Sequence, residues 1–85
     1  MATRNEQEGI YIVGGATSGF GGSAARALIE KGARVMAVAR TEENLKALQK
    51  SYPGQVEYVA GDLTDPSLHD QIIRQLGERF LYGIF

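Results

Sequence analysis

A cluster of glycines near the start of the chain is the segment best suited to chemistry. Six of the eleven glycines lie between Gly9 and Gly22, and the segment Gly14–Gly21 reads Gly-Gly-Ala-Thr-Ser-Gly-Phe-Gly. This segment follows an apolar, strand-like run and precedes a run of helix formers. The first backbone N–H groups of a helix lack partners, and together with the helix dipole they stabilise an anion. The sequence therefore predicts a phosphate-binding turn here.

The glycines of this turn are expected to have separate geometric roles. Gly15 permits a tight turn, Gly19 leaves the space that a side chain would take from a pyrophosphate, and Gly21 lets the helix approach the strand. The hydroxyl groups of Thr17 and Ser18 add donors for phosphate or ribose. No Gly-Lys-Ser/Thr sequence follows, which disfavours a P-loop nucleoside triphosphatase. The remaining alternative is a structural turn that binds nothing.

The spacing Gly-x-x-x-Gly-x-Gly resembles the cofactor motif of the short-chain dehydrogenase/reductase family, which is commonly Thr-Gly-x-x-x-Gly-x-Gly. Gly32–Val35 resembles the approach to the family's second strand, and Gly61–Asp65 resembles the acidic turn after its third strand. The likeness runs in order from Ile10 to Phe85. Gly14 departs from it, because the family usually has a threonine whose hydroxyl ties the turn to the following strands.

The end of the second expected strand bears on the choice of dinucleotide. An acidic residue about 20 residues beyond the glycine turn would accept hydrogen bonds from the ribose of NAD. This chain has Arg40 and Thr41 there, and a guanidinium can bind a 2′-phosphate with charge-assisted bonds worth roughly 1.5–3 kcal/mol. The sequence therefore favours NADP over NAD. The alternative for Arg40 is a solvated arginine paired with Glu43, and the family's other frequent basic position is Ser18 here.

The acidic turn after the third expected strand has two interpretations. The resemblance implies that the Asp62 carboxylate accepts from the exocyclic amine of adenine and that the Leu63 backbone contacts the ring edge. The alternative is an Asx turn leading to the next helix, where Asp65 already serves as the cap. Both can hold at once. His69 is expected to be a solvated surface residue, remote from the carboxyl ends of the strands.

The resemblance gives the complete set of predicted cofactor-binding residues, with Phe20 contributing its backbone N–H while its ring packs inward. They are Gly15, Thr17, Ser18, Gly19, Phe20, Gly21, Arg40, Thr41, Asp62 and Leu63.

The resemblance also implies the reaction of the complete protein, a hydride transfer between NADP(H) and a carbonyl or alcohol substrate. Family catalysis uses a serine, a tyrosine and a lysine four positions after that tyrosine, all beyond the fourth strand. None of the four tyrosines in this chain has a lysine four residues later, so we expect no catalytic residue and no reductase activity from these residues alone. The alternatives are a non-catalytic module that senses NADP and a truncated chain without independent function.

The elements that would position these residues alternate along the chain. Strands are expected at 9–14, 33–39, 56–60 and 80–85, because these runs are apolar and rich in β-formers. Helices are expected at 20–31, from Thr41 to Pro53, and from Pro66 over Leu68, Ile72, Ile73 and Leu76. Such alternation predicts an α/β fold, a Rossmann-type doubly wound parallel sheet of which only the N-terminal half is present.

The same pattern predicts the domain organisation. Residues 1–8 form a polar N-terminal tail, and residues 9–85 form a partial NAD(P)-binding Rossmann domain that is truncated at the fourth strand. The final apolar segment from Phe80 to Phe85 is expected to need a covering layer that the 85 residues do not supply.

The composition is that of an ordinary soluble globular protein. The chain is 44% hydrophobic and 22% charged, with a net charge of −1 and no cysteine. This balance argues against nucleic-acid and membrane partners, and the lack of cysteine excludes disulfides and suits the cytoplasm. The dinucleotide and the substrate are the expected partners, and the resemblance allows a homo-oligomer of the complete protein.

Overall fold

The computed structural model describes residues 9–17 and 19–85, so the predicted tail at 1–8 and Ser18 lie outside the described residues. Strands and helices alternate along this part of the chain, as the sequence predicted. The elements are β1 Gly9–Gly14, α1 Gly19–Glu30, β2 Val35–Ala39, α2 Glu42–Ser51, β3 Val56–Ala60, α3 Pro66–Leu76 and β4 Phe80–Ile84.

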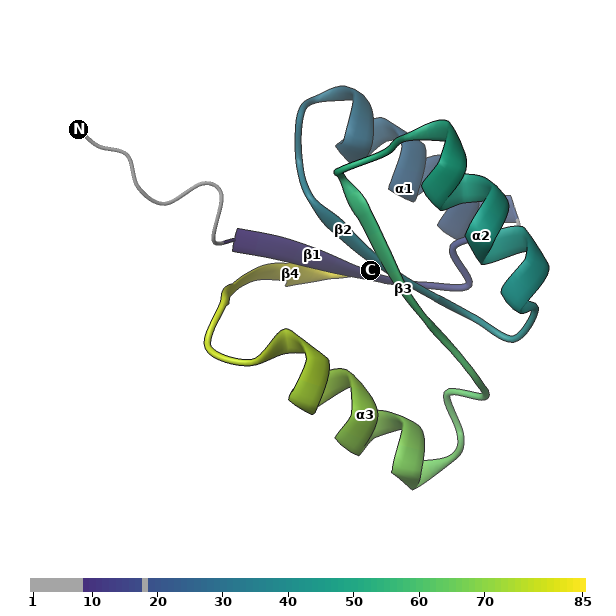
Figure 1. Cartoon of the computed structure of the whole chain (residues 1–85), viewed down its shortest axis with the longest axis vertical. Helices are drawn as coiled ribbons and strands as arrows, with labels where there is room; N and C mark the ends of the chain where they lie inside the picture. The colour runs from purple at the N-terminus through teal and green to yellow at the C-terminus, as the bar shows by residue number, and fades with distance from the viewer. Residues whose placement is uncertain (1–8, 18) are drawn as a thin grey trace.

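The strands form one parallel sheet in the order β3-β2-β1-β4 (Figure 1). The register between β1 and β2 is regular from the Tyr11–Val35 pair onward, and β2 pairs with β3 over its full length. The pairing of β1 with β4 shifts between Ile10 and Tyr11. This topology confirms the predicted α/β architecture, in which every strand ends at the same edge of the sheet.

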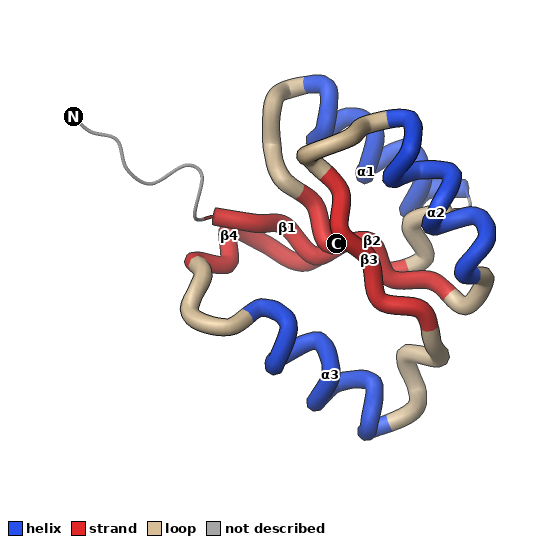
Figure 2. The backbone as a smooth tube through the Cα atoms, in the orientation of Figure 1, coloured by secondary structure: helices blue, strands red, loops and turns tan. Residues whose placement is uncertain are grey.

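The sheet separates two layers of helices, with α1 and α2 on one face and α3 on the other (Figure 2). Successive residues of a strand point to opposite faces, so an uninterrupted apolar run serves both layers. In β2, Val35 and Ala37 pack in the cluster under α1 and α2, whereas Met36 and Val38 pack toward α3. The continuous hydrophobicity of β2 is therefore explained by burial on both sides.

The helix boundaries follow local chemistry with one difference from the sequence prediction. Asp65 caps α3 as predicted, since its Oδ1 accepts from Ser67 N at 3.0 Å. Gly32 lies just past α1 with φ of +91°, the left-handed conformation expected there. Thr41 occupies the N-cap position of α2, but its side chain makes no capping hydrogen bond.

The apolar residues of α3 and β4 are covered unevenly. Leu68 is buried against the sheet. Ile73, which belongs to the same expected set of apolar helix residues, is 65% exposed and lies off the packed face. At the β4 edge, Ile84 and Phe85 are exposed as well. None of the helices in the described part of the chain is long and apolar enough to cross a membrane.

An ion pair joins the connection between α3 and β4 to β3. The Arg79 guanidinium donates to both carboxylate oxygens of Glu57, at 2.5 and 2.9 Å, and the Gln75 amide donates to the same carboxylate at 3.1 Å. These hydrogen bonds, led by that of Arg79, hold the pKa of Glu57 below its ordinary value of 4.5. Both side chains are about a quarter exposed, so the pair is partly shielded from solvent.

We predict that Glu57→Gln lowers the free energy of unfolding by about 1 kcal/mol at pH 7, because a neutral amide replaces the carboxylate that pairs with the Arg79 charge. The folded-state pKa of Glu57 is lowered, so its stabilising effect is present above the unfolded value and disappears as the pH falls through the folded value. Urea unfolding at pH 7 and at pH 3 measures this. Glu78→Gln is the matched control, and an equal loss at both pH values would contradict the prediction.

Candidate functional site

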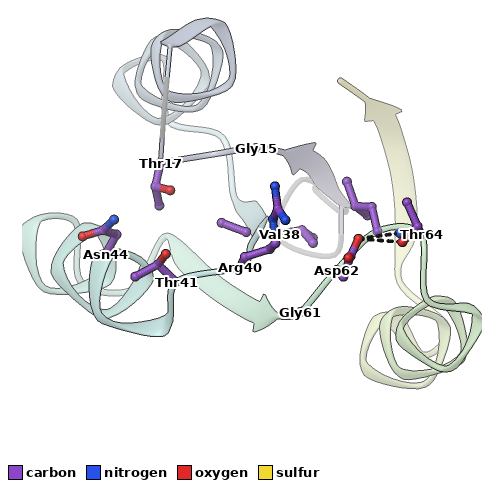
Figure 3. A pocket seen from close by; sticks show the side chains of 11 residues that line it. Gly15, Thr17, Val38, Arg40, Thr41, Asn44, Gly61, Asp62 and Thr64 are labelled. Atoms are coloured by element: carbon purple, nitrogen blue, oxygen red, sulfur yellow. Dashed lines mark hydrogen bonds between the residues drawn. The ribbon is translucent and has the colours of Figure 1, made fainter.

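The carboxyl ends of β1, β2 and β3 meet at one edge of the sheet, where open α/β sheets bind their ligands. A cavity of about 560 Å³ lies there (Figure 3). Six of the predicted site residues line it, namely Gly15, Thr17, Arg40, Thr41, Asp62 and Leu63. They come from three separate turns, so the fold brings together groups that are far apart in the sequence.

The glycine turn has the geometry that its composition predicts. Gly15 and Gly19 have φ of +62° and +45°, and a side-chain Cβ on either would point into open space. At Gly21 a Cβ would overlap the Gly15 carbonyl and lie 2.6 Å from the Gly14 carbonyl oxygen. The helix thus begins against the strand end, at a distance that only glycine permits.

The electrostatics at the N-terminal end of α1 favour an anion. The helix begins at Gly19, continues through Phe20, and carries no acidic residue in its first turn that would offset the positive end of its dipole. Ala16 N donates to Val38 O at 3.2 Å, which ties the turn to β2 and sets it beside the cavity. Ser18, the remaining predicted contact of this turn, lies outside the described residues.

Arg40 and Thr41 follow β2 and are both exposed. Figure 3 shows the Arg40 side chain between Thr41 on one side and Asp62 on the other. The alternative pairing of Arg40 with Glu43 is not found, since the ion pair within residues 9–17 and 19–85 joins Arg79 to Glu57. Thr41 lines the cavity, and its backbone carbonyl accepts from Leu45 N at 3.3 Å, whereas its side chain makes no capping hydrogen bond.

Asp62 forms the Asx turn that the sequence offered as one of two interpretations. Its Oδ1 accepts from Thr64 N at 2.9 Å and from Thr64 Oγ1 at 2.8 Å. These two hydrogen bonds, with a smaller effect of the nearby Arg40 charge, lower the pKa of Asp62 below its ordinary value of 3.8. The carboxylate is therefore charged at neutral pH, and Oδ2 has no hydrogen-bond partner within the described part of the chain.

His69 is exposed, but it is not remote from the site as the sequence suggested. Its Nε2 lies 2.7 Å from the carbonyl oxygen of Leu63, a residue that lines the cavity. The first turn of α3 follows the acidic turn so closely that the two segments contact each other. The sequence predicted a remote His69 because the residue lies within a helix, away from the strand ends. The short connection between β3 and α3 brings it back to Leu63.

The cavity has further lining residues that the sequence did not single out. They are Val38, Ala39, Asn44, Gly61 and Thr64. Thr64 was detectable, since Asp-x-Thr is a common Asx-turn pattern. Asn44 was not, because its place beside Thr17 depends on how α1 and α2 pack on the same face of the sheet (Figure 3).

Comparisons with known proteins agree on one family. The sequence model of the family described as short chain dehydrogenase matches residues 9–83. An L-xylulose reductase from Bos taurus is 42% identical over 66 residues, which cover 78% of this chain and 27% of the reductase. This chain thus spans about a quarter of the length of that relative.

Solved structures give the same result. The KRED1-Pglu enzyme has a TM-score of 0.77 and 36% identity, covering 84% of this chain and 30% of the enzyme. The closed form of a serine dehydrogenase complexed with NADP+ has a TM-score of 0.75 and 28% identity, covering 80% of this chain and 27% of that protein.

The close approach at Gly21 leads to a prediction about two neighbouring glycines. We predict that Gly21→Ala destabilises the protein by about 1–3 kcal/mol, because its Cβ would collide with backbone carbonyls that cannot move aside. Gly22→Ala is the matched control, since its Cβ would lie 3.4 Å from the nearest atom, Ala16 O. That variant should keep or gain up to about 1 kcal/mol through helix propensity. Thermal unfolding measures the stability of both variants. An equal loss of stability in the two would contradict the close approach of α1 to the end of β1.

Proposed function

The chain belongs to the short-chain dehydrogenase family of oxidoreductases, and we propose that residues 9–85 are the part that binds the adenosine and pyrophosphate of NADP(H). The observation that supports this most is the cavity at the strand ends, which is lined by the turn that leads into α1 and by Arg40, with no acidic residue directly after β2. The complete protein would transfer a hydride between the nicotinamide and a carbonyl or alcohol substrate.

The glycine turn fits a pyrophosphate. A side chain at Gly15 or Gly19 would project into open space, so glycine keeps that space free for a ligand at the start of α1. The N–H groups of Gly19 and Phe20, in the first turn of α1, would donate to phosphate oxygens, and the α1 dipole would favour the negative charge of the phosphate. Thr17, which lines the cavity, would add its hydroxyl.

Arg40 and Thr41 fit the 2′-phosphate that distinguishes NADP from NAD. Neither side chain is committed to the protein, since Arg40 has no ion-pair partner within the described residues and the Thr41 hydroxyl does not cap α2. A guanidinium binds phosphate through paired, charge-assisted hydrogen bonds. The similar serine dehydrogenase, which was solved with NADP+, is in keeping with this preference.

Asp62 and Leu63 would recognise the adenine. The Asx turn occupies one oxygen of the Asp62 carboxylate and leaves the other to accept from the exocyclic amine of the ring. The lowered pKa of Asp62 keeps it charged, and hence an acceptor, at neutral pH. The backbone of Leu63 would meet the edge of the same ring.

We predict that Arg40→Gln reduces the preference for NADPH over NADH about 10- to 100-fold, because charge-assisted bonds to the 2′-phosphate are lost while the shared parts of both dinucleotides still bind. Binding of each dinucleotide by calorimetry gives the ratio. Arg74→Gln, which removes the same charge from the exposed last turn of α3, is the control and should leave the ratio unchanged. An unchanged ratio in Arg40→Gln would show that this arginine does not read the 2′-phosphate.

A further inference from the structure

The turn from Gly61 to Asp65 is held by the first turns of α3 at two points. A Cβ on Gly61 would lie 2.6 Å from Leu68 Cδ1, so the buried Leu68 side chain packs directly on the start of the turn. His69, the next residue of the helix, reaches the Leu63 carbonyl with its Nε2. Because Asp65 caps the same helix, these two side chains project from a fixed position.

The contact of His69 with Leu63 has a defined chemistry. A carbonyl oxygen only accepts hydrogen bonds, so at 2.7 Å the Nε2 of His69 must carry the proton and donate it. The ring is therefore in the Nε2–H tautomer when it is neutral.

The Leu63 side chain lies in another direction, beside Gly14. A Cβ on Gly14 would lie 3.0 Å from Leu63 Cδ1, so the side chain of Leu63 extends over the end of β1 where a larger residue would crowd it. Leu63 is nevertheless 45% exposed and lines the cavity. The Leu63 carbonyl is thus tied to α3, and its side chain lies over the end of β1.

We propose that His69 is a positioning residue for adenine recognition, which holds the Leu63 carbonyl so that the backbone edge of Leu63 stays aligned with the adenine ring. This inference rests on the proposed function, because it assigns a residue to the adenine end of the same site. His69 would affect the binding of adenine, which NADP and NAD share. Its effect can therefore be separated from recognition of the 2′-phosphate by Arg40.

The test replaces His69 with glutamine or asparagine, whose side-chain amides imitate Nε2 and Nδ1 of histidine, respectively. In His69→Gln the terminal NH₂ can take the place of Nε2, whereas the shorter side chain of His69→Asn cannot reach the Leu63 carbonyl. Binding of 2′,5′-ADP, which carries adenine without nicotinamide, is measured by calorimetry on the 85-residue chain. We expect His69→Asn to weaken binding about three- to tenfold, as the loss of one hydrogen bond predicts, and His69→Gln to stay within about twofold of the unchanged chain.

The outcomes separate this inference from the proposed function. If the unchanged chain does not bind 2′,5′-ADP, the proposed function fails and this inference fails with it. If the unchanged chain binds 2′,5′-ADP and the two variants have the same affinity as each other, His69 is not a positioning residue. The proposed site itself would still stand. A lower melting temperature without a change in affinity would show a structural role only and would also overturn the inference.

A second measurement does not depend on any variant folding. The nitrogen chemical shifts of the His69 ring in the unchanged chain report its tautomer by NMR. We expect the neutral ring to carry its proton on Nε2, and a proton on Nδ1 would overturn the inference.

Discussion

The site depends on the close approach of α1 to the end of β1. A helix N-terminus attracts an anion only if its first N–H groups are exposed and unpaired, and it serves a ligand only if it lies next to the rest of the site. The second condition depends on Gly21, where any side chain would meet the carbonyls of Gly14 and Gly15. A helix displaced from this strand would direct its N–H groups away from the cavity.

The parallel sheet then supplies the remaining groups. Because all strands run in the same direction, the residues that follow β1, β2 and β3 meet at one edge although they are separated by whole helices. The turn after β1 would offer backbone N–H groups. The turn after β2 adds a guanidinium and the one after β3 a carboxylate (Figure 3). This order suits a ligand with a pyrophosphate, a second phosphate and an aromatic amine, which is the chemistry of NADP.

Local patterns predicted the fold and much of the candidate site. The apolar runs, the cap at Asp65 and the left-handed Gly32 depend on neighbours in sequence, and the structure bears them out. The contacts of Leu63 with His69 and Gly14 depend instead on how α3 and β1 lie in space, so no spacing in the sequence indicated them. The capping hydrogen bond expected of the Thr41 hydroxyl is absent for a related reason, since the N-cap position of a residue does not dictate where its side chain points.

A crystal structure of the chain with NADP+ tests the central claim most directly. We predict pyrophosphate oxygens within about 2.7–3.2 Å of the backbone nitrogens of Gly19 and Phe20, at the start of α1. A dinucleotide bound elsewhere on the sheet, or a glycine turn whose N–H groups bind the protein's own carbonyls while NADP+ is present, would contradict the claim.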